Sequence, residues 1–272
     1  MKELWNYYLS KSWVEPFLVS SIVLFAAASI ILYMLIIKSR AYNLKREGLS
    51  AKYNIIIEKV LFAVIFKDTA FAEIKRDTGC KLLSNKVFKN QMISSILNLH
   101  QNYEGAYAEK LEKFYAESGL IKKSFKKLRS KKWEVVCSGV KELAEMNVTE
   151  AFEKIIKISK TRNKTLKVIA LNAGIKLNGA KGLLHLVAHQ YPLDEWTQVN
   201  IIASIKLFEV EDTHGIEMLL ESKNSTVVVL GLKIIKTLGL SAKADYVARL
   251  AASEANYNIR MEAQNVLNSL NI

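Results

Sequence analysis

Proline is scarce in this chain: its 272 residues include only two, Pro16 and Pro192. Because proline interrupts helices and sheet ladders, its near absence permits long helices almost throughout. Half of the residues are hydrophobic, which is enough to bury a sizeable core. The composition therefore predicts an all-α protein.

Cysteine is equally scarce, and Cys80 and Cys137 do not form a C-x-x-C pair. This excludes a disulfide-rich scaffold and a cysteine-rich zinc site. Both cysteines have apolar neighbours, so we expect them to be reduced core residues, as in a cytosolic compartment.

Motifs for catalysis and cofactor binding are missing as well. His185 and His189 are four residues apart, but Leu186 stands where a zinc-protease helix needs glutamate, so we interpret them as residues of a polar helix face. The glycines of residues 174–182 match neither a dinucleotide-binding motif nor a Walker loop. We expect no catalytic residue, no metal, no cofactor and no small-molecule substrate.

The chain does contain one long uncharged apolar run, residues 16–37, between Glu15 and Lys38. At ~1.5 Å per residue, a helix of this length spans about 33 Å, which suffices for the ~30 Å hydrocarbon core of a bilayer. The alternative is a cleaved signal peptide, whose shorter apolar region of about 7 to 15 residues follows a basic segment. Residues 1–15 instead carry two lysines and two glutamates, so we predict a retained transmembrane helix.

Flanking charge predicts the orientation of this span. Lys2 and Lys11 precede it, whereas five basic residues follow within 15 positions: Lys38, Arg40, Lys45, Arg46 and Lys52. The positive-inside rule then places residues 1–15 outside as a short extracytoplasmic N-terminus and residues 38–48 inside as a basic juxtamembrane segment. The expected location is the inner (cytoplasmic) membrane, as a single-pass protein with its large C-terminal domain in the cytoplasm.

Residues 49–132 read as a helical lead-in. Gly48 offers a helix stop and Ser50 an N-cap. Amphipathic helices are expected at residues 80–100 and 104–117, where apolar residues recur at helical spacing.

The apolar run at residues 53–66 could be a second membrane segment. Glu58 and Lys59 lie in its middle, however, so an uncharged span of ~20 residues is not available. We predict a buried or membrane-apposed helix of the soluble domain.

Residues 122–132 contain seven basic residues in 11 positions, more than a packing helix needs. We interpret them as a docking patch for anionic lipid head groups of the inner leaflet or for an acidic protein. The alternative is a solvated face around Phe125 and Leu128. The seven are Lys122, Lys123, Lys126, Lys127, Arg129, Lys131 and Lys132.

The net charge of +13 is unevenly distributed. Residues 1–132 have 23 Lys and Arg against 11 Asp and Glu, whereas residues 133–272 have 16 against 15. A nearly neutral C-terminal half is not typical of a nucleic-acid-binding surface, so we expect no nucleic-acid partner.

From residue 133 the sequence repeats with a period near 31. We place Trp133, Leu166, Trp196, Val227 and Ile259 as equivalent, with separations of 33, 30, 31 and 32 residues. Each unit predicts a first helix of about 14 residues, a short turn and a second helix of about 10, so that neighbouring units must stack to bury their apolar faces. The predicted turns are Met146-Asn147, Asn178-Gly179, Glu211-Asp212, and Gly239 with Ser241. Trp133 and Trp196 are expected in the core.

Two segments carry a family resemblance, residues 230–239 and 259–267, in which small residues lie among large aliphatic ones. They resemble the first helix of HEAT repeats, in particular the short form of ~30 residues called phycobilisome-lyase-like. The resemblance covers residues 133–272, about 4.5 repeats, and implies a right-handed α-solenoid of HEAT-like helical hairpins after the transmembrane helix. The prolines and first-helix aspartates of the family are mostly missing here.

The order of parts, including the basic segment that leads into Trp133, is also similar to bacterial single-span, membrane-anchored HEAT-repeat proteins. Such proteins are often encoded beside membrane glycosyltransferases for surface polysaccharide. In HEAT arrays the second helices line the inner curve, so the resemblance implies partner contacts there. The candidates are Lys157, Lys181, Glu217, Glu221, Asp245 and Arg249.

Three functions are compatible with these patterns. The first is a non-catalytic, membrane-anchored scaffold or adaptor that binds a protein partner, such as a membrane protein or complex, at the cytoplasmic face. The second is a HEAT-like nucleic-acid-binding protein or DNA glycosylase-like enzyme, which the neutral array and 32 lysines against seven arginines disfavour. The third is a lyase or lyase chaperone for a tetrapyrrole, which only the name of the repeat suggests. We favour the scaffold.

Overall fold

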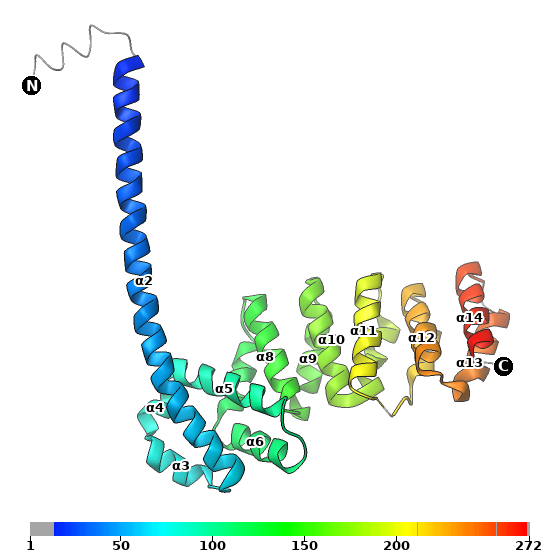
Figure 1. Ribbon diagram of the computed structural model, residues 1–272. Helices are drawn as coiled ribbons and strands as arrows, with labels where there is room; N and C mark the ends of the chain where they lie inside the picture. The colour runs from blue at the N-terminus through cyan, green and yellow to red at the C-terminus, as the bar shows by residue number, and fades with distance from the viewer. Residues whose placement is uncertain (1–13, 211, 254, 271–272) are drawn as a thin grey trace, which may run out of the picture. The chain divides into compact units, whose positions relative to one another are not determined.

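The computed structural model describes residues 14–210, 212–253 and 255–270, and every regular element in these ranges is a helix (Figure 1). This confirms the all-α prediction. The predicted extracytoplasmic residues 1–13 and Glu211 of one predicted turn lie outside the described residues.

The chain divides into two units, Met1–Val60 and Leu61–Ile272. The first unit contains most of helix α2, Val14–Phe66, a single helix of 53 residues. The predicted interruption at Gly48 and Ser50 is wrong, because α2 continues through both residues. One glycine costs a helix only about 1 kcal/mol, which the surrounding helix-forming residues offset.

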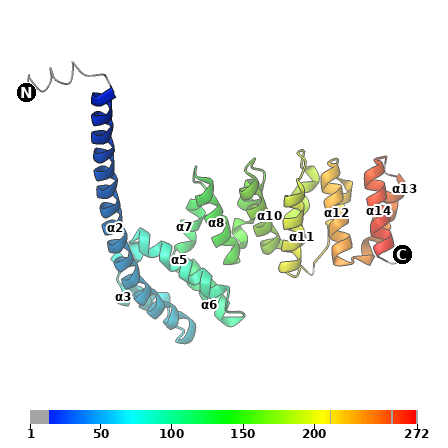
Figure 2. The same ribbon diagram turned by 45° about the horizontal axis from the view of Figure 1, so that its top comes forward.

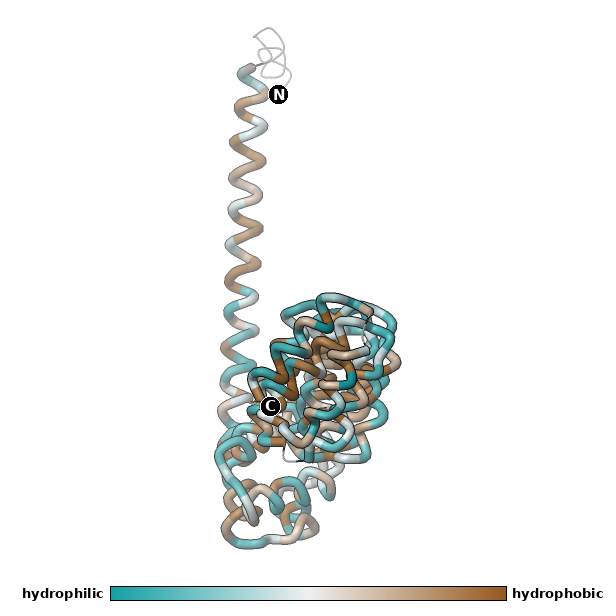
Figure 3. The backbone as a smooth tube through the Cα atoms, turned by 90° about the vertical axis from the view of Figure 1, so that its right-hand side faces the viewer, coloured by the Kyte–Doolittle hydropathy of each residue, from teal (hydrophilic) through white to brown (hydrophobic). Residues whose placement is uncertain are grey.

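The N-terminal part of α2 is almost wholly apolar, as its colouring in Figure 3 shows. The large hydrophobic side chains between Phe17 and Ile37 are exposed to solvent. Ser20 and Ser29 donate hydrogen bonds to the carbonyls of Phe17 and Phe25, both at 2.8 Å, so their hydroxyls are satisfied within the helix. The helix is long and apolar enough to cross a membrane.

The second unit begins with the end of α2 and five helices. These are α3 Phe71–Thr78, α4 Cys80–Ser84, α5 Lys86–His100, α6 Ala106–Glu117 and α7 Leu120–Lys127. The helix predicted at residues 80–100 is broken at Asn85, whose side chain accepts hydrogen bonds from the backbone N–H groups of Val87 and Phe88 and so starts α5. The predicted helix at 104–117 is confirmed as α6, which ends at Ser118 and Gly119.

The lead-in helices enclose a small core of their own. Leu61, Val64 and Ile65 at the end of α2 are buried, with Phe88 and Leu111 also fully enclosed. Their spacing of three and four residues puts the α2 side chains on one helix face. The prediction of a buried helix at residues 53–66 is therefore confirmed for the part that belongs to this unit.

The helix that begins each unit of the repeating sequence from residue 133 is called its first helix. These first helices stand side by side in chain order and run in the same direction (Figures 1 and 2). They are α8 Trp133–Glu145, α10 Lys164–Asn178, α11 Glu195–Leu207, α12 Ser225–Leu238 and α14 Tyr257–Ser269. Their lengths of 13 to 15 residues match the prediction.

A second, shorter element follows each first helix except the last. These are η1 Thr149–Ala151 with α9 Phe152–Ser159, η2 Gly179–Ala188, η3 Ile216–Glu221, and η4 Ser241–Lys243 with α13 Ala244–Ser253. Two of them, η2 and η3, are 3₁₀ helices instead of the predicted α-helices. Close packing fixes η2, since a Cβ on Gly182 would lie 2.5 Å from the carbonyl carbon of Gly174 in α10.

The register of the repeats is set by their N-caps. Asn163, Asp194, Asn224 and Asn256 precede α10, α11, α12 and α14, and each accepts a hydrogen bond from a backbone N–H two or three residues on, at 2.9 to 3.1 Å. The caps are 31, 30 and 32 residues apart. Lys132 precedes α8 without such a bond.

This register corrects the placement of the two tryptophans. Leu166, Val227 and Ile259 are third residues of their helices and are buried, whereas Trp133 is the first residue of α8 and Trp196 the second of α11. Trp133 is 43% exposed and Trp196 53% exposed. The prediction that both are core residues is wrong, because one or two positions in a helix turn a side chain by about 100° each.

Candidate docking groove and basic segment

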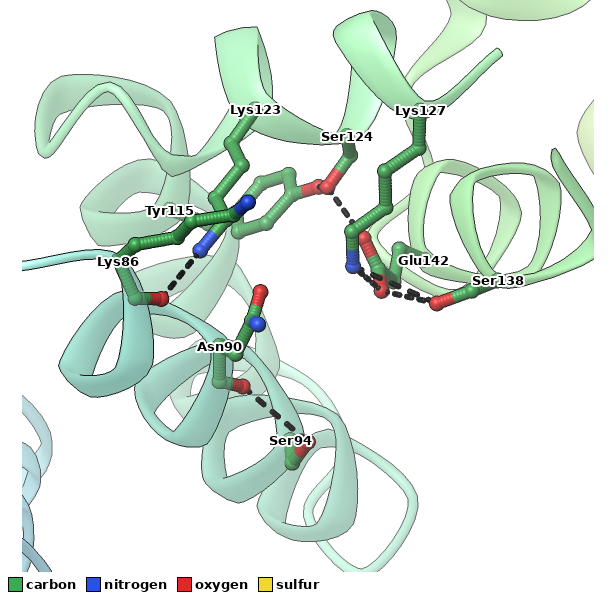
Figure 4. Close-up of polar contacts among 9 residues, drawn as sticks. All are labelled: Lys86, Asn90, Ser94, Tyr115, Lys123, Ser124, Lys127, Ser138 and Glu142. Carbon is green, nitrogen blue, oxygen red and sulfur yellow. Dashed lines mark hydrogen bonds and ion pairs between the residues drawn. The ribbon is translucent and has the colours of Figure 1, made fainter. Parts of the chain in front are cut away.

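The basic segment of residues 122–132 is split between the surface and the interior. It lies on α7 and the loop to α8. Lys122, Lys126, Arg129, Lys131 and Lys132 are exposed, as a docking patch requires. Lys123 and Lys127 instead point into the junction between the helices, as Figure 4 shows.

Lys127 belongs to a buried polar network (Figure 4). Its ammonium group forms an ion pair with Glu142 of α8, which also accepts hydrogen bonds from Ser138 at 2.7 Å and Ser124 at 2.6 Å. Ser124 in turn accepts a hydrogen bond from the hydroxyl of Tyr115, at 2.7 Å. Burial raises the pKa of Tyr115 far above its ordinary value, so its hydroxyl stays protonated and donates. The network satisfies a carboxylate that would otherwise be buried at high cost.

Lys123 is partly buried and is also held by a contact with the protein. Its ammonium group donates a hydrogen bond to the backbone carbonyl of Lys86, at 2.7 Å. Burial, together with the neighbouring charges of Lys127 and Lys89, lowers the pKa of Lys123 to about 8. It therefore carries only part of a charge in mildly alkaline solution.

Close packing of α7 against α8 explains why Lys127 is enclosed, whereas Lys123 is directed toward the start of α5. A Cβ on Gly139 of α8 would lie 2.8 Å from the Cβ of Lys127 and 3.0 Å from the carbonyl oxygen of Ser124. Only glycine permits this approach. The sequence-predicted patch is thus reduced to its five exposed members, and the other two join the lead-in to the array.

A groove of about 480 Å³ lies on the face formed by the first helices. Helix α5 provides one wall, and α8 and α10 provide the other; Phe208, which follows α11, also contributes to the lining. Its lining is Ser94, Leu97, Asn98, Gln101, Lys141, Ala144, Glu145, Ile169, Asn172, Ala173, Lys176 and Phe208.

Polar contacts connect the helices that line the groove. Glu145 of α8 pairs with Lys176 of α10 at 2.7 Å and lies 3.7 Å from the ring of His100, at the end of α5. The ring of His100 also lies 2.9 Å from Glu112 of α6. The ammonium group of Lys176 is 5.9 Å from the ring centre of Phe208. The groove is thus preformed by contacts that join four helices.

The lining combines carboxamides with one unpaired acceptor. Ser94, Asn98, Gln101 and Lys141 are exposed and line the opening. Within the described residues, the side-chain oxygen of Asn172 is buried and has no hydrogen-bond partner. Each carboxamide offers both a donor and an acceptor, as does each peptide unit of an extended chain. The groove can therefore pair with peptide backbone through side chains on two walls.

The candidates on the second elements have different surroundings. Lys157, Lys181, Glu221, Asp245 and Arg249 are exposed on α9, η2, η3 and α13. The guanidinium of Arg249 stacks on the ring of Tyr246, 4.7 Å from its centre.

Glu217 of η3 is not available for a partner in the same way. It is buried and forms an ion pair with Lys243 at 2.7 Å. Burial, the largest single influence, would raise the pKa of Glu217, but the hydrogen bond from Lys243, a backbone hydrogen bond and the nearby charges of Lys243 and His214 together outweigh it, so the net shift is downward. Glu217 thus joins η3 to η4. The groove described above lies on the first helices, not on these second elements.

The two histidines of η2 do not face a common ligand. The ring of His185 lies 2.9 Å from the hydroxyl of Ser159 in α9, and burial lowers the pKa of His185 to about 4. His189 stacks edge-on against Tyr191. Among the described residues, no three His, Cys, Asp or Glu side chains are placed to hold a metal ion.

The groove residues were missed by sequence reasoning. Asn98 and Gln101 lie on the polar face of a predicted amphipathic helix, and Asn172 interrupts the apolar pattern of α10. Polar residues at these positions indicate that these surfaces of α5 and α10 are not wholly covered by the protein core. Nothing in the sequence states that α5 lies against α8, which creates the groove.

Comparisons with known proteins add little to this picture. No family model and no curated protein sequence matches the chain. Among solved structures, the chain is similar to the crystal structure of an engineered protein, with 17% sequence identity and a TM-score of 0.32. That match covers 70% of this chain and 94% of the other.

Proposed function

We propose that this protein is a non-catalytic, membrane-anchored scaffold that holds a protein partner at the cytoplasmic face of the inner membrane. In this proposal α2 is a single span with its N-terminus outside. The repeats at residues 133–272 form a right-handed, HEAT-like α-solenoid. A membrane glycosyltransferase or a polysaccharide-assembly complex is the kind of partner that the sequence resemblance suggests.

Three features of α2 support the anchor and its orientation. Its apolar segment is exposed along residues 17–37, whereas the core helix of a soluble protein would be covered. Its serine hydroxyls are satisfied within the helix, so they add little to the cost of insertion. Basic residues follow the segment at once, as the positive-inside rule requires for a cytoplasmic C-terminal domain.

The groove between α5, α8 and α10 is the observation that carries the scaffold proposal. It is preformed, open, and lined by carboxamide and charged side chains around an apolar strip of Leu97, Ile169 and Phe208. Such a lining suits a peptide segment of a protein, because backbone groups pair with the carboxamides and one or two side chains fill the strip. An anchored groove also raises the effective concentration of a membrane partner.

A nucleic-acid-binding function is the alternative, and the charge of the groove disfavours it. Lys141 and Lys176 face one acidic residue, Glu145, which already pairs with Lys176. Phosphate backbones require several free cations along a surface, and this groove offers one, Lys141, among its described lining residues.

The test is a mild-detergent pull-down of the full-length protein from its native membrane, with proteins identified by mass spectrometry. Asn98→Trp places a large side chain at the groove opening. Asn90→Trp is the matched control, because Asn90 is an exposed asparagine of the same helix that does not line the groove. Both variants are first checked for unchanged thermal melting.

We expect one stoichiometric membrane protein with the wild type and with Asn90→Trp, and its loss with Asn98→Trp. Recovery of nucleic acid in place of a protein would support the alternative. A partner retained by Asn98→Trp would show that the groove is not the binding site.

A further inference from the structure

The loops that precede the first helices gather at one edge of the array. The first helices are parallel, so residues 129–133, 160–164, 190–195 and 222–225 lie together where α8, α10, α11 and α12 begin (Figures 1 and 2). We call this the N-terminal edge. The described residues at the start of α14 extend it.

Hydrogen bonds between neighbouring loops make this edge a continuous surface. The side chain of Asn224 donates to the carbonyl of Tyr191 at 2.8 Å, and the backbone N–H of Leu193 donates to the hydroxyl of Thr226 at 2.8 Å. Lys164 pairs with Asp194 at 3.0 Å. Adjacent loops are therefore held at fixed positions.

Large aromatic side chains are exposed along the same edge. Trp133, Tyr191, Trp196 and Tyr257 all lie in these loops or in the first turn of the helices that follow, and all are exposed. Exposed tryptophan and tyrosine are typical of surfaces that meet lipid head groups, because one side of the ring system is apolar and the other is polar. Because these four side chains are exposed, packing in the core does not explain why they lie on one edge.

Basic charge exceeds acidic charge at this edge. Among its described residues, Glu134 and Glu195 are the exposed acidic ones, and the exposed basic ones are Arg129, Lys131, Lys132, Lys160, Arg162, Lys164 and Lys223.

The opposite edge, where the first helices end, exposes Glu150, Glu209, Asp212 and Asp245 together with Lys181, Lys206 and Lys236. Its exposed charges nearly balance, so the basic excess of the array lies at the N-terminal edge.

We propose that the N-terminal edge docks onto anionic lipid head groups of the bilayer in which α2 is anchored. Basic side chains are attracted to an anionic leaflet and aromatic rings settle at the interface. This rests on the proposed function, because α2 must first bring the array to a membrane. The docked array keeps its groove free, since the groove is lined by the middle and end of α8 and α10.

The test uses the full chain in lipid nanodiscs with bromine-labelled acyl chains, which quench nearby tryptophan fluorescence. Trp5→Phe and Trp13→Phe remove the other tryptophans, so that Trp133 and Trp196 report on the edge. The discs contain phosphatidylcholine alone or with about one third phosphatidylglycerol. A Lys160→Glu, Arg162→Glu, Lys223→Glu variant is compared with a Lys181→Glu, Lys206→Glu, Lys236→Glu control, in which three exposed lysines lie toward the opposite edge.

We expect strong quenching in the anionic discs, weak quenching in neutral discs, loss of quenching in the first variant and no change in the control. Equal tryptophan emission in neutral and anionic discs, from protein that has inserted into both, would overturn the edge proposal but would not contradict the membrane anchor. Failure of the protein to enter discs at all would overturn the anchor, and the edge proposal with it. Quenching relieved by added nucleic acid or acidic protein would show that the edge serves another ligand.

Discussion

Lys127 of α7 and Glu142 of α8 form an ion pair at the junction between the lead-in helices and the repeats, with Ser124 and Ser138 completing the bonds of the carboxylate. A lysine from the most basic stretch of the chain therefore serves to join two parts of the fold. The exposed members of that stretch remain available for lipid or a partner.

Glu142→Gln should destabilise the second unit by about 3 kcal/mol, because Lys127 is left partly buried without a counter-charge. Thermal melting of the detergent-solubilised full-length protein measures this loss. Glu134→Gln, an exposed change on the same helix, is the control and should leave the melt unchanged. Equal melts for both variants would show that the pair contributes nothing to stability.

Leu166→Ala should destabilise the protein by about 2–5 kcal/mol, because this side chain is only 7% exposed. Trp196→Ala, at the neighbouring position of the next repeat, should cost less than about 1 kcal/mol because the indole is half exposed. Denaturant unfolding of both variants measures the difference. A larger loss of unfolding free energy for Trp196→Ala than for Leu166→Ala would show that Trp196 is a core residue.

Glu209→Gly should stabilise the protein by about 1 kcal/mol. Glu209 follows α11 with a φ of 45°, a left-handed conformation that a side chain disfavours by ~1–2 kcal/mol. Asn147 has a φ of 48° at the matching turn after α8, and since asparagine tolerates this conformation better, Asn147→Gly should gain less. A lower melting temperature for Glu209→Gly than for the wild type would show that the backbone at Glu209 is not strained.

His185 should make the folded state less stable in acid. Burial lowers its pKa to about 4 from an ordinary 6.5, so the unfolded chain binds the extra proton first as pH falls. The free energy of unfolding should therefore decline below pH 6.5 by up to about 3 kcal/mol near pH 4.

Unfolding of His185→Gln over the same pH range isolates this contribution, because the carboxylates titrate equally in both proteins. The variant should lose part of the slope, whereas His214→Gln, at an exposed position, should keep it. Parallel curves for wild type and His185→Gln would show that His185 is not buried as a neutral group.

The periodicity of apolar residues was enough to predict the helices, because apolar residues at 3.6-residue spacing are typical of an amphipathic α-helix. It did not give the register. The predicted register aligns Trp133 and Trp196 with buried residues of the other repeats, whereas the helix starts are marked by Asn163, Asp194, Asn224 and Asn256. Aligning the caps Asn163 and Asp194 places Trp196 one position before the equivalent of Leu166, where it is exposed, whereas α8 has no side-chain cap from which to place Trp133.

The candidate site was less accessible from the sequence. A run of lysines has no pattern that separates Lys123 and Lys127 from their exposed neighbours. The difference arises from tertiary contacts, namely the close approach of Lys127 to Gly139 of α8 and the hydrogen bond from Lys123 to the carbonyl of Lys86. The groove likewise depends on α5 lying against α8, a contact between residues about 45 positions apart.

The most direct test of the scaffold is photocrosslinking from the groove in native membranes. A benzophenone amino acid replaces Asn98 in the full-length protein, or Asn90 as the control outside the groove. The account predicts one discrete protein adduct from position 98 and none from position 90. The same adducts from both positions, or crosslinking to nucleic acid alone, would contradict it.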